Sequence, residues 1–175
     1  MRFRSIAIAL LSAVCVVSHA ADDPLEYRVK AAFLFNFARF VTWPSSRFAT
    51  PDAPVEVCVL GSPGFSDVLE ETVAGKTVGT RQLHVKRVEQ ARDLLDCHVA
   101  YVMTDSAAQT GHLLSQIGGH GVLTVYEASG TLPGGVVRFY LEDRRVRFEI
   151  NAAEAEREKL QVSSKLLAVA KVVDE

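Results

Sequence analysis

Two short motifs combine residue types that could do chemistry, and both fail on spacing or position. Gly75-Lys76-Thr77 ends like a phosphate-binding loop, but that motif needs a glycine five residues before Gly75, where this chain has Glu70. Ser163-Ser164-Lys165 carries the serine and lysine of one class of nucleophile. It lies at the start of a predicted helix, however, where serine is an ordinary N-cap. The sequence also lacks a Gly-x-Ser-x-Gly elbow.

The histidines after residue 20 are too dispersed to predict a metal site. They are His84, His98, His112 and His120. No two have the spacing of metal ligands on one helix, and no acidic residue completes a zinc signature. His98 follows Cys97, but neighbouring side chains on a strand point to opposite faces, so this pair does not predict a paired nucleophile and base. We therefore predict no catalytic residues, no metal ligands and no cofactor, and hence a protein that is not an enzyme.

Residues 1–20 have the features of a secretory signal peptide. Two arginines precede an apolar run, and Ser18-His19-Ala20 places small residues at the −3 and −1 positions of a cleavage site. Cys15 raises the alternative of a lipoprotein, but the residues before it fit a lipobox poorly. We expect residues 21–175 to form one soluble, exported domain, without direct membrane insertion.

Charge and cysteine content limit the function classes of the mature chain. Loss of two arginines with residues 1–20 changes the formal net charge from −2 to −4. A nucleic-acid partner would need a basic stripe, so we exclude one. Cys58 and Cys97 remain, and an even pair in an oxidising compartment predicts a disulfide. The alternative is a redox-responsive pair.

Apolar runs alternate with turn signals in the manner of βαβ units. Strands are predicted at residues 55–60, 82–88, 98–104 and 122–126. Helices are predicted at residues 65–73 and 106–117, with a short helix or turn at 89–95. Residues 136–141 and 145–150 predict an antiparallel hairpin, which is followed by a helix capped at Asn151 and by a last helix over 161–173. The expected fold class is α/β: a mainly parallel sheet of five or six strands with a C-terminal antiparallel hairpin and helices on both faces, a Rossmann-like or flavodoxin-like three-layer sandwich.

The densest aromatic segment predicts one long helix from Pro24 to Trp43. It holds six of the chain's fourteen aromatic residues. Asp23 is the expected N-cap, and Pro44 the expected stop. At helical spacing, one face groups the expected core residues Val29, Phe33, Phe37 and Phe40. The opposite face groups Arg28, Asn36 and Arg39, with Phe35 among them. That phenyl is either covered by another element or offered to a partner.

The predicted hairpin carries the second group of candidate residues. Val146, Phe148 and Ile150 alternate with Arg145, Arg147 and Glu149, and Arg138 joins the charged face from the neighbouring strand. This face is either solvated and crossed by weak ion pairs, or a docking patch beside the aromatic helix. The candidate partner-binding residues are Arg28, Phe35, Asn36, Arg39, Arg145, Arg147 and Glu149.

Residues 27–44, Tyr-Arg-Val-Lys-Ala-Ala-Phe-Leu-Phe-Asn-Phe-Ala-Arg-Phe-Val-Thr-Trp-Pro, resemble the opening signature of the YfiR-like periplasmic family. Later segments resemble that family's motifs in the same order. They are residues 57–61, 97–102, 145–151 and 163–167. The resemblance spans about residues 25–173, which is nearly the whole mature chain.

The resemblance implies a periplasmic regulator without catalysis of its own. The best-known members bind the periplasmic region of an inner-membrane diguanylate cyclase, YfiN, and hold it inactive. An outer-membrane lipoprotein, YfiB, can sequester the repressor, and the output is cyclic-di-GMP signalling and biofilm formation. Members have an α/β fold and are often dimeric, so a homodimer is a further expected partner.

The family also bears on the cysteines and on an alternative function. Cys58 and Cys97 match family cysteine positions. The second pair that some members carry near the hairpin is missing here, which favours a single structural bridge over redox sensing. Family members also occur beside sensor kinases. The alternative is therefore a small-molecule-binding module that acts with a kinase and holds its ligand near Gly61–Gly64, at the carboxyl ends of the strands.

Overall fold

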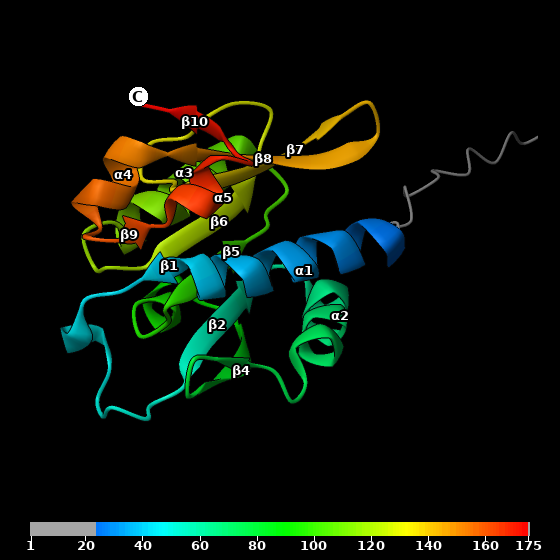
Figure 1. The fold of residues 1–175 in the computed structure, drawn as a ribbon. Coiled ribbons are helices and arrows are strands. Elements are labelled where there is room, and N and C mark those ends of the chain that lie inside the picture. Colours follow the sequence, from blue (N-terminus) through cyan, green and yellow to red (C-terminus); the bar gives the residue numbers. More distant parts are fainter. Residues whose placement is uncertain (1–23, 175) are drawn as a thin grey trace, which may run out of the picture.

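The computed structural model describes residues 24–174 (Figure 1). The expected signal peptide, Cys15 and the expected cap Asp23 lie outside this range. In residues 24–174, no helix is both long enough and apolar enough to span a bilayer.

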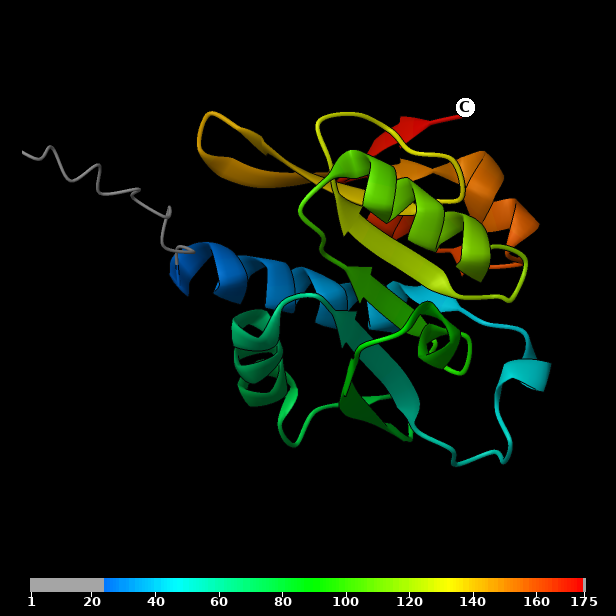
Figure 2. The same ribbon diagram turned by 180° about the vertical axis from the view of Figure 1, so that it is seen from behind.

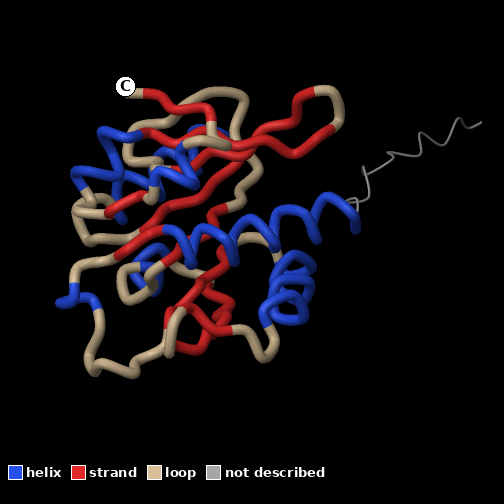
Figure 3. Tube along the Cα trace, viewed as in Figure 1, coloured by secondary structure: helices blue, strands red, loops and turns tan. Residues whose placement is uncertain are grey.

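An eight-stranded sheet forms the centre of the domain (Figure 3), in the order β10-β8-β7-β6-β5-β2-β4-β3. Its strands are β2 (Val55–Leu60), β3 (Thr77–Val78), β4 (Arg81–Val88), β5 (Val99–Val102), β6 (Leu123–Glu127), β7 (Val137–Glu142), β8 (Arg145–Asn151) and β10 (Lys171–Val173). From β4 to β7 all neighbours are parallel, whereas β7 and β8 form an antiparallel hairpin. The predicted α/β class is confirmed, and the short strands β3 and β10 extend the sheet beyond the expected five or six.

Helices cover both faces of this sheet (Figure 2). They are α1 (Pro24–Phe40), α2 (Pro63–Val73), α3 (Ala107–Ile117), α4 (Ala152–Arg157) and α5 (Ser164–Leu167), with the 3-10 turns η1 (Ser45–Arg47) and η2 (Ala91–Leu94). Alternate strand residues face two separate cores, as the two-residue period of a strand requires. Val57 and Tyr101 belong to the larger core under α1 and α2, and Leu60 and Val102 belong to the smaller core under η2 and α3.

Two predicted helix boundaries are wrong, and strand pairing explains both. Helix α1 ends at Phe40, because β1 (Val41–Thr42) pairs with β9 (Gln161–Val162) in a small antiparallel sheet. The predicted helix over 161–173 divides into β9, the single turn of α5, and β10. Strand β10 pairs with β8, so its β-branched residues gain ladder hydrogen bonds that outweigh the local helical pattern.

Two predicted helix starts are confirmed by their caps. The Ser106 hydroxyl accepts a hydrogen bond from the Gln109 amide at 3.2 Å. The Asn151 side chain accepts one from the Glu154 amide at 3.0 Å. Each cap satisfies one of the donors that the first helical turn leaves unpaired.

The core face of α1 differs from the predicted stripe. Its fully buried residues are Tyr27, Lys30, Ala31, Leu34, Phe37 and Ala38. Of the predicted stripe, Phe37 is buried, and Phe33 and Phe40 are partly buried against the larger core. Phe33 is half-buried on the flank of the helix, where its ring lies 5.1 Å from that of Phe148 in β8. The buried face differs from the predicted one because α1 packs simultaneously on the sheet, on α2 and on the hairpin. Helical periodicity alone does not predict this set of contacts.

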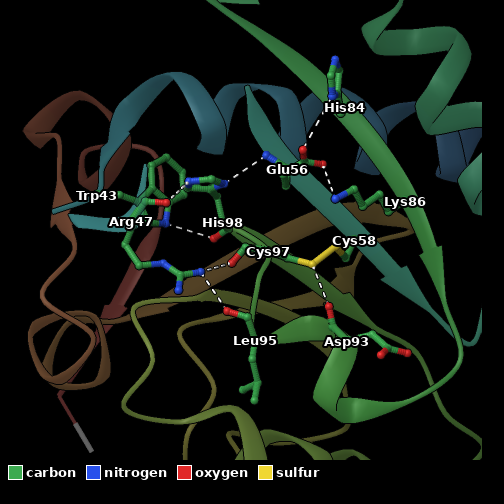
Figure 4. The surroundings of a disulfide bond; sticks show 10 residues. All are labelled: Trp43, Arg47, Glu56, Cys58, His84, Lys86, Asp93, Leu95, Cys97 and His98. Atoms are coloured by element: carbon green, nitrogen blue, oxygen red, sulfur yellow. Dashed lines mark hydrogen bonds and ion pairs between the residues drawn. A yellow bond between two sulfur atoms is a disulfide. The ribbon is translucent and has the colours of Figure 1, made fainter. Parts of the chain in front are cut away.

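Cys58 in β2 and Cys97, just before β5, form the expected disulfide (Figure 4). Their Cα atoms are 6.0 Å apart, which is an ordinary span for a disulfide. Both cysteines are buried in the smaller core. The bridge therefore ties the segment that follows η2 to the central strand β2.

His98 lies buried beside this bridge and joins three segments (Figure 4). Its Nδ1 accepts a hydrogen bond from the Glu56 amide at 3.0 Å, which leaves Nε2 to donate to the Arg47 carbonyl at 3.2 Å. The Trp43 indole donates to the His98 carbonyl at 3.0 Å. Burial, followed by the charge of Arg47, lowers the pKa of His98 from 6.5 to about 4. The imidazole is therefore held neutral.

Loss of the disulfide should destabilise the fold. In the chain-entropy model, a bridge with a sequence separation of 39 stabilises by about 4 kcal/mol. The variant Cys58→Ala/Cys97→Ala should unfold at lower denaturant concentration than the oxidised wild type, and its midpoint should not respond to a reductant. Equal midpoints for oxidised and reduced wild-type protein would contradict a structural bridge.

Acid should destabilise the fold through His98. The unfolded state takes up a proton near pH 6.5, whereas the folded state resists protonation until about pH 4. Stability is therefore lost as the pH falls across this window, by about 3 kcal/mol in total. Unfolding curves from pH 7 to pH 4 should show this loss in wild type and in His112→Gln, a control at an exposed histidine of α3. In His98→Asn the loss should be much smaller, and an unchanged pH dependence in that variant would refute the assignment.

Candidate partner-binding surface

The outward face of α1 carries three of the predicted partner-binding residues. Arg28 and Arg39 are exposed and Asn36 is half-buried. Ala32, also exposed, lies between Arg28 and Asn36, so the middle of this face carries only a small side chain. The predicted outer face of the helix is therefore confirmed for Arg28 and Arg39.

Phe35 lies at the edge of this face and is half covered. Its ring packs against the larger core. The Lys76 ammonium lies 4.8 Å from the ring centroid, and the Arg39 guanidinium lies 5.6 Å from it. Such cation–π contacts shield the phenyl on two sides. The segment after α2 therefore covers part of the ring, and the rest of the ring remains accessible.

The expectation that Glu149 lies on an exposed charged face is wrong. Its side chain is only 2% exposed. Arg138 binds both carboxylate oxygens, at 2.6 and 2.8 Å, and the Thr131 hydroxyl donates a third hydrogen bond at 2.9 Å. These bonds, that from Arg138 above all, lower the pKa of Glu149. Alternation along β8 correctly grouped Glu149 with Arg145 and Arg147, but it could not predict the loop containing Thr131, which contributes to the burial of this carboxylate.

The other two charged hairpin residues are exposed, and they have different surroundings. The Arg147 guanidinium lies 3.6 Å from the Glu142 carboxylate across the hairpin. Arg145 has no ion-pair partner in the part of the chain that the structure describes, and it is among the residues that line a groove between the hairpin and the N-terminal half of α1. The hairpin thus brings one predicted arginine, Arg145, to the predicted helix.

This α1–hairpin groove has a volume of about 330 Å³. It is lined by Leu25, Glu26, Val29, Phe33, Leu141, Arg144, Arg145 and Val146. The hairpin tip and the first turn of α1 project from the same end of the domain (Figure 1). Leu25 and Leu141 remain 65% and 57% exposed in the groove, so the fold leaves apolar surface uncovered there.

The hairpin tip beside the groove has an unusual backbone. Asp143 and Arg144, between the two strands, have φ angles of +51° and +59°. A two-residue turn of this kind favours glycine, above all at its second position. An L-residue with a larger side chain in the left-handed region costs about 1–2 kcal/mol. Arg144 was not among the predicted partner-binding residues. A two-residue turn that lacks glycine was the sequence feature that could have identified it.

A buried ion-pair cluster holds α1 at this position. Lys30 is 2% exposed, and its ammonium contacts the carboxylates of Glu26 and of Glu127, the latter at 2.6 Å. The Tyr101 hydroxyl donates to Glu127 from the neighbouring strand β5. Burial, with a further contribution from Glu127, raises the pKa of Tyr101 well above its ordinary value. The cluster joins α1 to the carboxyl ends of β5 and β6.

The glycine-rich segment 61–64, the expected ligand position of the alternative function, lies between β2 and α2. Gly61 has a φ of +88°, and a Cβ there would lie 1.8 Å from the Met103 carbonyl oxygen, so the backbones of two strand ends touch. The Tyr27 hydroxyl of α1 lies 3.3 Å from the Ser62 hydroxyl. An open cleft of about 560 Å³ remains on the outer side, toward β4. In residues 24–174, no three histidine, cysteine or acidic side chains group as a metal site would require.

Comparison with solved structures supports the fold. A conserved domain protein from Vibrio cholerae aligns with a TM-score of 0.54 at 10% identity. The alignment covers 83% of this chain, and this chain spans 59% of that protein. An ABC domain in complex with L-Trp from Streptococcus pneumonia aligns with a TM-score of 0.44 at 12% identity, covering 67% and 56% of the two chains. No curated protein matches the sequence.

Comparison with protein families is more specific. The model of the YfiR/HmsC-like family matches residues 27–171. The match begins in the first turn of α1 and ends at the start of β10, so it includes the aromatic helix, both cysteines and the hairpin. The chain therefore belongs to the YfiR/HmsC-like family.

Proposed function

We propose that this protein is a non-catalytic periplasmic regulator that binds the periplasmic region of an inner-membrane diguanylate cyclase and represses it. Membership of the YfiR/HmsC-like family carries this proposal, because the family implies a periplasmic regulator of diguanylate cyclase signalling. Repression would lower cyclic-di-GMP and thereby limit biofilm formation. A YfiB-type outer-membrane lipoprotein and a second copy of this chain are further proposed partners.

Repression by binding requires a difference in affinity. The regulator shifts the cyclase toward its inactive state only if it binds that state more tightly than the active one. The protein therefore needs a surface with well-defined anchors. The outer face of α1 and the hairpin supply arginines and partly covered apolar side chains, which is the composition of interface hot spots. Arg28, Phe35, Asn36, Arg39, Arg145 and Arg147 are the proposed contacts on this surface, and Arg144 at the hairpin tip is added to them.

The direct test is capture of the mature protein by the immobilised periplasmic region of the cyclase. Wild type should bind, and Arg28→Glu/Arg147→Glu should bind at least roughly tenfold more weakly, because reversed charges repel the partner surface. Arg92→Glu is the matched control, since Arg92 is exposed in η2 on the opposite face of the sheet. Failure of wild type to bind would contradict the proposed partner, and full binding by the double variant would contradict the proposed surface.

Arg144→Gly should separate stability from binding. Glycine adopts the left-handed turn without steric cost, so the free energy of unfolding should rise by about 0.5–1 kcal/mol, as measured by denaturant titration. Binding to the cyclase region should weaken, because the guanidinium is lost. Arg145→Gly, at a strand position with ordinary backbone angles, should lower stability instead. Destabilisation by Arg144→Gly would show that the turn has no strain to relieve.

A further inference from the structure

We infer that the α1–hairpin groove binds an amphipathic helix of the partner protein, with apolar side chains in the groove and carboxylates on its arginines. This inference rests on the proposed function and adds the chemistry of the bound segment. Three independent observations support it: the apolar lining, the unpaired charges at the rim and the backbone of the hairpin tip.

The apolar lining has the length and direction of a helix-binding groove. Leu25, Val29 and Phe33 are spaced four residues apart, so they form one row along α1. The row extends over about 12 Å at 1.5 Å per residue, which is about two helical turns. Leu141 and Val146 line the groove from the hairpin. Apolar side chains at i, i+3 and i+4 of a partner helix fit between such rows.

The charged residues that line the groove are two arginines and one glutamate. Arg144 and Arg145 line the groove, and within residues 24–174 neither has an acidic partner within 4.0 Å. Of the nearby carboxylates, Glu26 is paired with buried Lys30, and Glu142 lies 3.6 Å from Arg147. Two guanidinium groups are thus free to bind carboxylates, and arginine does so in a planar, bidentate manner.

The backbone of the hairpin tip is strained at Arg144. Arg144 occupies a turn position where glycine would cost less, and its side chain lines the groove. An observed backbone outlier beside a groove supports a functional role for the side chain that it carries.

A protein helix fits these features better than a membrane surface does. The two exposed leucines lie on opposite sides of a concave groove, whereas a bilayer would favour a protruding apolar patch.

The test uses two synthetic helical peptides of about 20 residues, a length at which isolated helices begin to be stable. Both carry leucines on one side; glutamates flank the leucines in the acidic peptide, and lysines replace the glutamates in the basic peptide. Mature wild-type protein should bind the acidic peptide at least roughly tenfold more tightly in calorimetric titrations. This binding should weaken as the salt concentration rises from about 0.05 M to about 0.5 M.

Matched variants assign the binding to the groove. Arg144→Glu/Arg145→Glu and Leu141→Ser should each weaken binding of the acidic peptide roughly tenfold. Arg92→Glu and Val169→Ser, which change an arginine and an exposed valine outside the groove, should leave it unchanged. Equal affinity for both peptides, or unchanged binding by the groove variants, would overturn the inference. So would binding of wild type to anionic phosphatidylglycerol vesicles, but to neither peptide, because the groove would then serve a lipid surface.

The same variants distinguish a failure of the groove inference from a failure of the proposed function. If the cyclase region binds wild type and Arg144→Glu/Arg145→Glu equally well, the regulator role stands and the groove inference fails. If the acidic peptide binds in the groove but the cyclase region does not bind at all, the groove inference stands and the proposed partner fails.

Discussion

The fixed position of α1 on the sheet is the constraint on which the rest of the structure depends. Lys30 supplies it: its ammonium is buried between Glu26 of the same helix and Glu127 at the end of β6. A rotation of the helix would take this buried ammonium away from Glu127, and an unpaired buried charge is strongly destabilising, so the helix cannot rotate freely about its axis. With that rotation fixed, Arg28 and Arg39 face solvent, and Phe33 and Leu25 face the hairpin.

The two cores have different roles in this arrangement. The larger core, under α1 and α2, sets the geometry of the candidate surface. The smaller core, under η2 and α3, contains the Cys58–Cys97 bridge. His98 connects the two regions, because its carbonyl accepts the Trp43 hydrogen bond three residues after α1 ends. The segment that follows α1 is therefore held in place by the region around the disulfide.

Local patterns in the sequence predicted much of the fold and part of the candidate surface. Alternation of strands and helices gave the α/β class, and the turn after Leu141 gave the hairpin. Periodicity placed Arg28 and Arg39 outside, but it also placed Val29 in the core and left Lys30 out of it. A lysine is predicted to be exposed unless its acidic partners are known, and Glu127 is 97 residues away in the chain.

The remaining errors share one cause, which is pairing between distant segments. Residues 161–173 have a helical pattern, but parts of this segment form strands that pair with β1 and β8. Glu149 appeared exposed because nothing in its own strand predicts the loop that contains Thr131, although Arg138 was placed on the same face. The groove itself depends on the distance between α1 and a hairpin more than 100 residues later in the chain, so no local pattern could predict it.

Hydrogen–deuterium exchange of the mature protein, alone and in complex with the periplasmic region of the cyclase, would show directly whether α1 and the hairpin form the binding surface. We expect slower exchange on binding in peptides that cover residues 25–39 and 141–147, and unchanged exchange in η2 and α3 on the opposite face. Protection confined to η2 and α3, with no change in α1 or the hairpin, would contradict this expectation.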